Sequence, residues 1–201
     1  MKVLQVNAVS GYGSTGRICV ELSEGLIALG HQAFIAYSHG VSSFPDSFRF
    51  GDTLEQKKHA LLSRITGLQG YFSPRGTRDL IEWIKREEPD IVHLHNLHSN
   101  DINIIQLLGF LGSSNISTVV TLHDCWFFTG KCTHFTEDNC YQWENHCKKC
   151  PRLKKDNPSY FFDRTEKMFH EKRNAFDEIK NLGVIGVSDW ITGIAKRSYL
   201  N

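Results

Sequence analysis

The sequence lacks the features that mark several large classes of protein. It has no run of about 18 apolar residues, which argues against a membrane-spanning helix. Lysine and arginine number 23 against 22 aspartate and glutamate residues, so no global charge favours binding to nucleic acid. The N-terminus turns polar early and has no signal-peptide core, and low-complexity tracts and internal repeats are absent. We therefore expect a cytoplasmic globular protein in which residues 1–201 form a single domain.

Cysteine is the residue type whose placement needs an explanation. Four of the six cysteines lie close together in the chain, at Cys132, Cys140, Cys147 and Cys150, and the last pair forms C-x-x-C-Pro. Four thiolates at this spacing suit a tetrahedral structural zinc. Free reduced thiols and disulfides of an oxidised preparation are the alternatives. The surrounding segment, 125–157, is rich in aromatic residues, which we expect to pack it onto the domain.

Short apolar, often β-branched runs alternate with helical patterns along the chain. The predicted strands cover residues 3–9, 33–37, 90–95, 117–122 and 184–187. The predicted helices cover residues 18–29, 60–68, 77–84 with Thr77 as cap, 102–111, 160–182 and 188–200, and residues 40–53 are predicted as a loop. Strands that alternate with helices form parallel sheets, so the sequence predicts an α/β fold with a doubly wound, mainly parallel, Rossmann-like sheet.

A glycine-rich turn follows the first predicted strand. The stretch Gly11-Tyr-Gly-Ser-Thr-Gly16 fits the pattern G-x-G-x-x-G between a strand and a helix. Its glycines would let the backbone approach a phosphate, and the helix N-terminus favours negative charge. The acidic ribose partner of a dinucleotide site is missing, because Tyr37-Ser38-His39 ends the second strand. We predict a phosphate or sugar contact without NAD; a turn that only packs helix on strand is the alternative.

Polar residues also follow three later strands. His95 and Asn96 end one strand, His123 and Asp124 follow the next, and Asp189 and Trp190 follow the last, after Ser188. The carboxyl ends of parallel strands meet at one edge, so these residues should face a common crevice. His93 shares a strand face with His95, but we expect it to be a hydrogen-bonded core residue.

Taken in order, these motifs resemble the N-terminal domain of GT-B glycosyltransferases of family 4, in the branch that makes bacterial surface polysaccharides. The matching pieces are Gly11-Tyr-Gly-Ser-Thr-Gly-Arg17, Leu29-Gly-His31, Pro89-Asp-Ile-Val-His-Leu-His-Asn96, Thr121-Leu-His-Asp-Cys-Trp-Phe-Phe-Thr-Gly130, the C-x-x-C-Pro and Val187-Ser-Asp-Trp190. Each piece alone is loose, whereas their order along nearly the whole chain is specific.

The resemblance implies retaining transfer of a sugar from a nucleotide-diphosphate donor to a saccharide or lipid-linked acceptor. It assigns donor-phosphate contacts to the glycine loop, catalytic roles to the strand-end His-Asp and acceptor contacts to the other strand ends. The residues are Gly13, Ser14, Thr15, Gly16 and Arg17 for the phosphate; His123 and Asp124 for catalysis; and His95, Asn96, Asp189 and Trp190 for the acceptor.

The resemblance also implies what lies outside these residues. Such enzymes need no catalytic metal, so a zinc would be structural. Their C-terminal, donor-binding domain is absent from this chain, which we therefore expect to be inactive alone. They often work at the inner face of the membrane, so a peripheral membrane contact is expected too. A zinc-stabilised, non-catalytic carbohydrate- or protein-binding module is the alternative function, and an NAD-dependent oxidoreductase is disfavoured by the missing ribose carboxylate.

Overall fold

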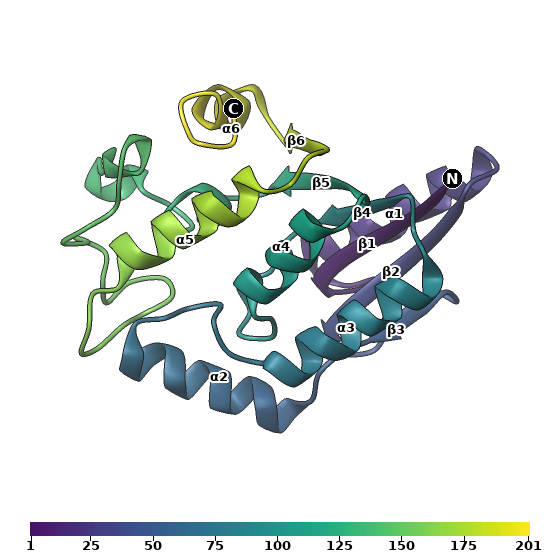
Figure 1. Cartoon of the computed structure of the whole chain (residues 1–201), viewed down its shortest axis with the longest axis horizontal. Helices are drawn as coiled ribbons and strands as arrows, with labels where there is room; N and C mark the ends of the chain where they lie inside the picture. Colours follow the sequence, from purple (N-terminus) through teal and green to yellow (C-terminus); the bar gives the residue numbers. More distant parts are fainter.

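A six-stranded, all-parallel sheet forms the centre of the protein in the computed structural model, which describes residues 1–201 (Figure 1). The strands are β1 (Lys2–Val9), β2 (Gln32–His39), β3 (Ser47–Arg49), β4 (Ile91–Leu94), β5 (Ser117–Leu122) and β6 (Leu182–Gly186). Their order in the sheet is β3-β2-β1-β4-β5-β6, and all five pairings are parallel. This is the strand order of a doubly wound Rossmann-like sheet, so the predicted fold class is confirmed.

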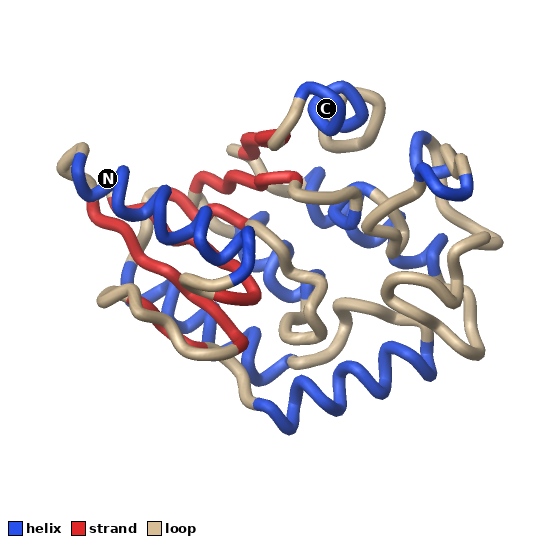
Figure 2. Tube along the Cα trace, turned by 180° about the vertical axis from the view of Figure 1, so that it is seen from behind, coloured by secondary structure: helices blue, strands red, loops and turns tan.

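Helices cover both faces of the sheet. They are α1 (Gly13–Ala28), α2 (Thr53–Thr66), α3 (Pro74–Glu87), α4 (Ile104–Ser113), α5 (Thr165–Asp177) and α6 (Asp189–Ala195). Figure 2 shows α1 on one face of the sheet, whereas Figure 1 shows α3, α4 and α5 on the other. None of the helices is both long enough and apolar enough to cross a bilayer.

The central strands form because their apolar runs are buried on both faces, as parallel strands require. Six consecutive residues of β1 are buried, and β5 buries Val120 and Leu122 completely. Leu4 and Val6 of β1 and Val120 and Leu122 of β5 belong to one core of 31 residues, which continues through α3 and α4 into the aromatic segment after β5. The central strands are therefore buried on both faces, and in β1 the polar residues Gln5 and Asn7 are buried along with the apolar ones.

Several predicted elements have different bounds, and the helix predicted over residues 60–68 begins seven residues earlier, at Thr53. The long helix predicted over residues 160–182 is shorter: α5 begins at Thr165 and ends at Asp177. Just before it, Asp163 accepts hydrogen bonds from the backbone N–H and the hydroxyl of Thr165 (2.9 and 2.6 Å). Thr77 is not a cap: it lies inside α3, and its hydroxyl donates to Ser73 O at 2.8 Å. The loop predicted over residues 40–53 contains β3, an edge strand of three residues.

Residues 125–157 contain three short 3-10 helices, Trp126–Phe128, Thr136–Asp138 and Gln142–Glu144. Trp126, Phe128, Phe135 and Trp143 are buried in the main core, so the predicted packing of the aromatic residues is confirmed. A buried lysine holds the loops together: Lys131 Nζ donates to the carbonyl oxygens of Arg152, Leu153 and Lys155 at 2.8 to 3.2 Å. The segment is therefore part of the domain's core and not a separate unit.

The N-terminus of α3 is capped from another helix. Ser73 makes no side-chain cap, and instead the carboxylate of Glu55, on α2, accepts hydrogen bonds from Arg75 N and Gly76 N, both at 2.9 Å. A carboxylate at a helix N-terminus is stabilised by the free N–H groups and by the helix dipole. This contact joins α2 to the rest of the fold.

Replacing Glu55 should therefore destabilise the protein. We expect Glu55→Ala to lower the free energy of unfolding by about 1–3 kcal/mol, because two charge-assisted hydrogen bonds are lost. The matched control is Glu82→Ala, which removes an exposed carboxylate of α3 that pairs only with Lys85. Urea unfolding measures both variants; equal losses in the two would contradict the capping role.

Candidate functional site

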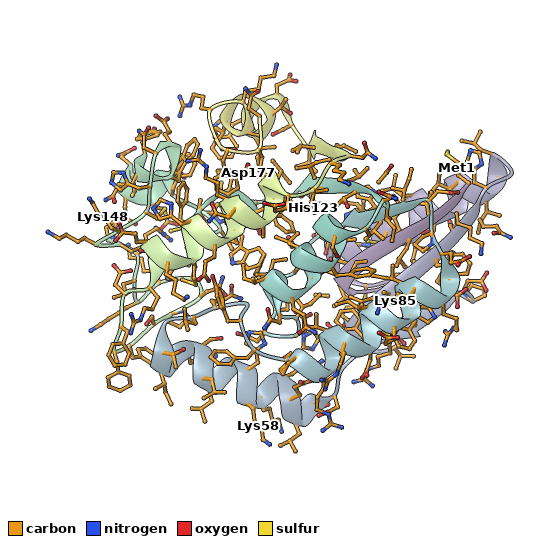
Figure 3. All side chains as sticks on the ribbon, viewed as in Figure 1. Met1, Lys58, Lys85, His123, Lys148 and Asp177 are labelled. Atoms are coloured by element: carbon orange, nitrogen blue, oxygen red, sulfur yellow. The ribbon has the colours of Figure 1, made fainter.

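Two histidines meet at the carboxyl edge of the sheet. His95 follows β4 and His123 follows β5, and the distance from His95 Nδ1 to His123 Nε2 is 3.0 Å. The other ring nitrogen of His95, Nε2, lies 2.7 Å from Gln5 Oε1 on β1. His95 is fully buried, whereas His123 is partly exposed. Figure 3 labels His123, which stands directly after β5. Three neighbouring strands therefore contribute to one hydrogen-bonded chain that ends at an accessible imidazole.

The hydrogen bonds between Gln5, His95 and His123 show which ring nitrogens carry protons. Gln5 Oε1 can only accept, so His95 Nε2 carries the proton and His95 Nδ1 accepts. The proton between the two rings must then belong to His123 Nε2, which donates to His95. A neutral imidazole carries only one N–H, so His123 Nδ1 is left as an acceptor. Gln5 and His95 thus fix both the orientation and the tautomer of His123.

Burial keeps this cluster neutral. Burial lowers the pKa of His95 to about 2, helped by its neighbours His93 and His123. Burial also lowers the pKa of His93 to about 4, and it lowers the pKa of His123. His93 donates to or accepts from Thr121 Oγ1 at 2.7 Å, as expected of a hydrogen-bonded core residue. The site therefore presents uncharged imidazoles, which bind hydroxyl groups, near neutral pH.

Beside this neutral cluster lies a histidine–aspartate pair, His98 and Asp124. Asp124 Oδ2 is 2.8 Å from His98 Nε2, and the two side chains are only 13% and 21% exposed. Burial alone would lower the pKa of His98, but the hydrogen bond and the charge of Asp124 raise it. Asp124 Oδ1 accepts from Trp126 N at 2.8 Å, so both carboxylate oxygens have a partner inside the chain. This geometry suits a positioning carboxylate that holds the loop after β5.

The glycine-rich turn is fastened to the same edge by Asn7, a buried residue of β1 that no sequence motif indicates. Asn7 Nδ2 donates to Val9 O (2.8 Å) and to Thr15 Oγ1 (3.2 Å), while Asn7 Oδ1 accepts from Asn96 N (3.1 Å). One amide thus connects the loop after β1 with the residue after β4. Gly16 packs closely under the loop, and its carbonyl accepts from Gly11 N at 3.0 Å.

The outer part of the turn faces solvent. Gly13 and Ser14 are exposed in the first turn of α1, where N–H groups have no partner within the helix. Arg17 is also exposed, and its Nε donates to Gly13 O at 3.2 Å. The structure thus combines free helix N–H groups, small residues and a guanidinium beside the strand ends. This combination is able to hold an anion.

Asp189 and Trp190, which were predicted to border the acceptor, lie at the start of α6 and have no hydrogen bond to the histidine cluster. Asp189 and Trp190 begin α6, and Trp190 stacks on Phe135 with ring centroids 6.2 Å apart and an angle of 15°. Both rings, together with Tyr141 and Arg197, border a hollow of about 230 Å³. No hydrogen bond joins Asp189 or Trp190 to the histidine cluster.

The four clustered cysteines line one small cavity of about 20 Å³. They are free thiols, and no group of three or more His, Cys, Asp or Glu residues is arranged to hold a metal ion. One of them has a hydrogen-bond partner, since Cys147 Sγ accepts from Gly130 N at 3.3 Å. The predicted zinc site at Cys132, Cys140, Cys147 and Cys150 is therefore not supported, because the four side chains form no group arranged to hold a metal ion.

A buried carboxylate lies at the end of β2, where the sequence shows only Tyr37-Ser38-His39. Asp101, from the loop after β4, hydrogen-bonds to Ser38 Oγ and lies 3.6 Å from His39 Nε2. Burial raises the pKa of Asp101, against the opposing effects of Ser38 and His39. Sequence reasoning missed this contact because residues 38 and 101 are joined only by the tertiary structure.

Comparison with known proteins adds an independent observation. A family model described as Glycosyltransferase Family 4 matches residues 15–176. The chain is 27% identical over 199 residues to "Putative colanic acid biosynthesis glycosyl transferase WcaC" of Escherichia coli (strain K12), a match that covers 91% of this chain and 47% of that protein. The chain thus spans about half the length of the curated relative it matches.

The close packing of Gly16 leads to a stability prediction. A Cβ at Gly16 would lie 3.0 Å from Val9 Cγ2 and 3.3 Å from the backbone of Gly11, so we expect Gly16→Ala to cost about 1–3 kcal/mol. Gly25 lies in the same helix with nothing within 4 Å of such a Cβ, so Gly25→Ala should stabilise the protein by about 0.5–1 kcal/mol. Denaturant midpoints test the contrast, and effects of the same sign would refute it.

The buried neutral histidines predict how stability depends on pH. The pKa of His59, like that of His93, is lowered by burial to about 4, from 6.5. The unfolded chain binds these protons first, so stability is present above pH 6.5 and is lost as the pH falls toward 4. The pKa of His98 is raised, so its contribution to stability is present below pH 6.5 and is lost only as the pH rises above that value, outside this window.

We expect each of these histidines to lower the free energy of unfolding by about 1.5 kcal/mol between pH 6.5 and pH 5. His59→Gln should therefore flatten the pH dependence by about that amount, as measured by urea unfolding at the two pH values. Parallel curves for the wild type and His59→Gln would show that His59 does not titrate as its burial requires.

Proposed function

Because the chain belongs to glycosyltransferase family 4, we propose that it supplies the acceptor-side half of an enzyme that moves a sugar from a nucleotide-diphosphate sugar to a saccharide or lipid-linked acceptor. The proposed process is bacterial surface polysaccharide synthesis, since the relative from Escherichia coli is named for colanic acid biosynthesis. The observation that carries the proposal is that the matched residues, 15–176, include both histidines of the strand-edge cluster.

In this proposal the glycine turn approaches the donor diphosphate. The exposed N–H groups at Gly13 and Ser14 and the guanidinium of Arg17 supply positive potential at a helix N-terminus. Thr15 is held toward Asn7 and keeps the turn in place, and Gly16 allows the helix to pack on β1. The turn would then stabilise charge on the leaving group as the donor bond breaks.

His123 is the proposed catalytic residue. Its Nδ1 is an acceptor and points away from the bond to His95, so it is able to orient a sugar hydroxyl. Asp124 would act through the loop, as a positioning residue, because both of its oxygens are already engaged by His98 and Trp126. His95 is fully buried, so it would act by holding His123 rather than by touching the acceptor. Asn96 would border the acceptor at the same edge, and Asp189 and Trp190 would border it from α6.

The proposal includes a second domain that carries most of the donor site. A leaving diphosphate needs stabilising groups on both sides of a cleft, and this chain contributes one wall. We therefore propose that residues 1–201 are inactive alone, that transfer is retaining and proceeds without a catalytic metal, and that the enzyme acts in the cytoplasm at the inner face of the membrane. A structural zinc is not part of the proposal, because the four thiols form no metal-holding group.

The test measures release of nucleoside diphosphate by the full-length protein, mixed with a panel of UDP-, GDP- and dTDP-sugars and with saccharide and lipid-linked acceptors. Release that depends on both a donor and an acceptor supports the transferase. A full-length, folded protein that releases nucleotide from none of the donors would overturn the proposal.

The same assay tests His123. We expect His123→Ala to lower kcat/KM by about 100-fold, in line with the loss of an interaction made in the transition state. His134→Ala is the matched control, because His134 is an exposed histidine of the neighbouring segment. Retention of wild-type kcat/KM by His123→Ala would remove His123 from catalysis, provided that both variants unfold at the wild-type midpoint.

A further inference from the structure

Helix α2 buries its polar face and exposes its apolar face, the reverse of an ordinary surface helix. The residues it buries are polar: Gln56, His59 and Ser63. Its large apolar side chains are on the outside instead, namely Leu54, Leu61, Leu62 and Ile65. Leu61 is 57% exposed, although a surface helix normally turns such residues toward the core.

Specific hydrogen bonds hold α2 in this orientation. Gln56 Nε2 donates to Ser38 O at 3.1 Å, and His59 Nδ1 lies 2.8 Å from Ser73 Oγ. His59 Nε2 accepts from Gly70 N at 3.3 Å, so both nitrogens of this buried ring have partners. Rotating the helix to bury its leucines would leave these polar groups without partners, which is strongly unfavourable for buried groups. The exposed apolar face is therefore built into the fold.

A second apolar element extends the same surface. Tyr160, Phe161 and Phe162 are three consecutive exposed aromatic residues, and Phe161 is 69% exposed. They are attached to the C-terminal end of α2, because Tyr160 N donates to Arg64 O at 2.9 Å. The backbone of Phe162 also lies against Gly67, the C-cap of the helix. Figures 1 and 2 show α2 along the outer edge of the molecule with no element covering it.

The charges on this surface are basic. Lys57, Lys58 and Arg64 are exposed on α2, and Figure 3 shows Lys58 at the outer edge of the molecule. Arg164 lies over the ring of Phe162, 5.6 Å from its centroid. The acidic residues of the helix are used elsewhere: Asp52 caps α2 and Glu55 caps α3. Apolar and cationic side chains therefore alternate over one continuous face.

We propose that this face, made by α2 and residues 160–162, docks on the surface of an anionic phospholipid bilayer. An amphipathic helix with leucines and aromatic residues beside Lys and Arg lies in the lipid interface, with the apolar groups among the acyl chains and the cations at the headgroups. A second copy of the chain would bring like charges together, and lysine is depleted in the centre of protein–protein interfaces. The bilayer therefore fits this surface best.

Docking has a consequence for the acceptor. A bilayer-bound enzyme meets a lipid-linked acceptor directly, whereas a free saccharide gains nothing from the membrane. This consequence rests on the proposed transferase function, but the docking itself does not. Binding to vesicles is measured without donor or acceptor, so the failure of one proposal is distinguishable from the failure of the other.

The experiment measures co-flotation of the purified chain with vesicles of phosphatidylcholine, with and without phosphatidylglycerol. We expect binding to the anionic vesicles that weakens as salt is raised, because exposed charges are screened. The double variant Leu61→Ser with Phe161→Ser should bind at least about tenfold more weakly, since two large apolar groups are removed from the interface. Lys57→Glu with Lys58→Glu should lose the preference for phosphatidylglycerol.

The matched control is Leu29→Ser, which removes a side chain that is 75% exposed at the end of α1, on the other face of the sheet. It should leave vesicle binding unchanged. Three results would overturn the proposal: no binding to anionic vesicles, equal binding by all variants, or a concentration-dependent dimer that Leu61→Ser with Phe161→Ser abolishes. The last result would assign the face to a second copy of the chain.

Discussion

The candidate site depends on one constraint, the parallel register of β1, β4 and β5. In that register Gln5 lies beside His93, and His93 lies beside Val119 on the next strand. The strand ends then bring Gln5, His95 and His123 into one hydrogen-bonded chain, although Gln5 and His95 are 90 residues apart in sequence. A slip of one residue would turn every side chain of a strand to the opposite face and break this chain.

The same edge separates neutral from charged groups. Burial keeps the imidazoles of His93 and His95 uncharged, whereas the carboxylate of Asp124 raises the pKa of His98 a short distance away. A neutral imidazole is suited to bind hydroxyl groups, and a carboxylate with hydrogen bonds to both of its oxygens is suited to hold a loop. The structure thus gives different partners to two adjacent residues: His123 is bonded to the neutral His95, and Asp124 is bonded to His98 and Trp126 N.

Helix α2 differs from the core of the molecule in which side chains it buries. Around the central strands the apolar side chains are buried, and even the aromatic residues of the cysteine-containing segment join the main core. At α2 the pattern is reversed, because the hydrogen bonds of Gln56 and His59 occupy the inner face of that helix. Such an arrangement is stable alone only because its buried polar groups are satisfied, and it leaves an apolar, basic face for something outside the chain.

The sequence by itself determined the parallel α/β fold, since short, mostly apolar or β-branched runs such as residues 3–9 and 117–122 alternate with helical patterns along the chain. It also located the strand-end residues His95 and His123, because the order of residues along the chain fixes which side chains come directly after each strand. Only the tertiary structure decided that Gln5 and Asn7 support these residues, that Glu55 caps another helix and that α2 faces outward. These contacts join residues far apart in the chain, and periodicity carries no information about such pairs. The cysteines show the same limit: their spacing allowed a metal site, but side-chain geometry, which spacing does not determine, gave each thiol its neighbours.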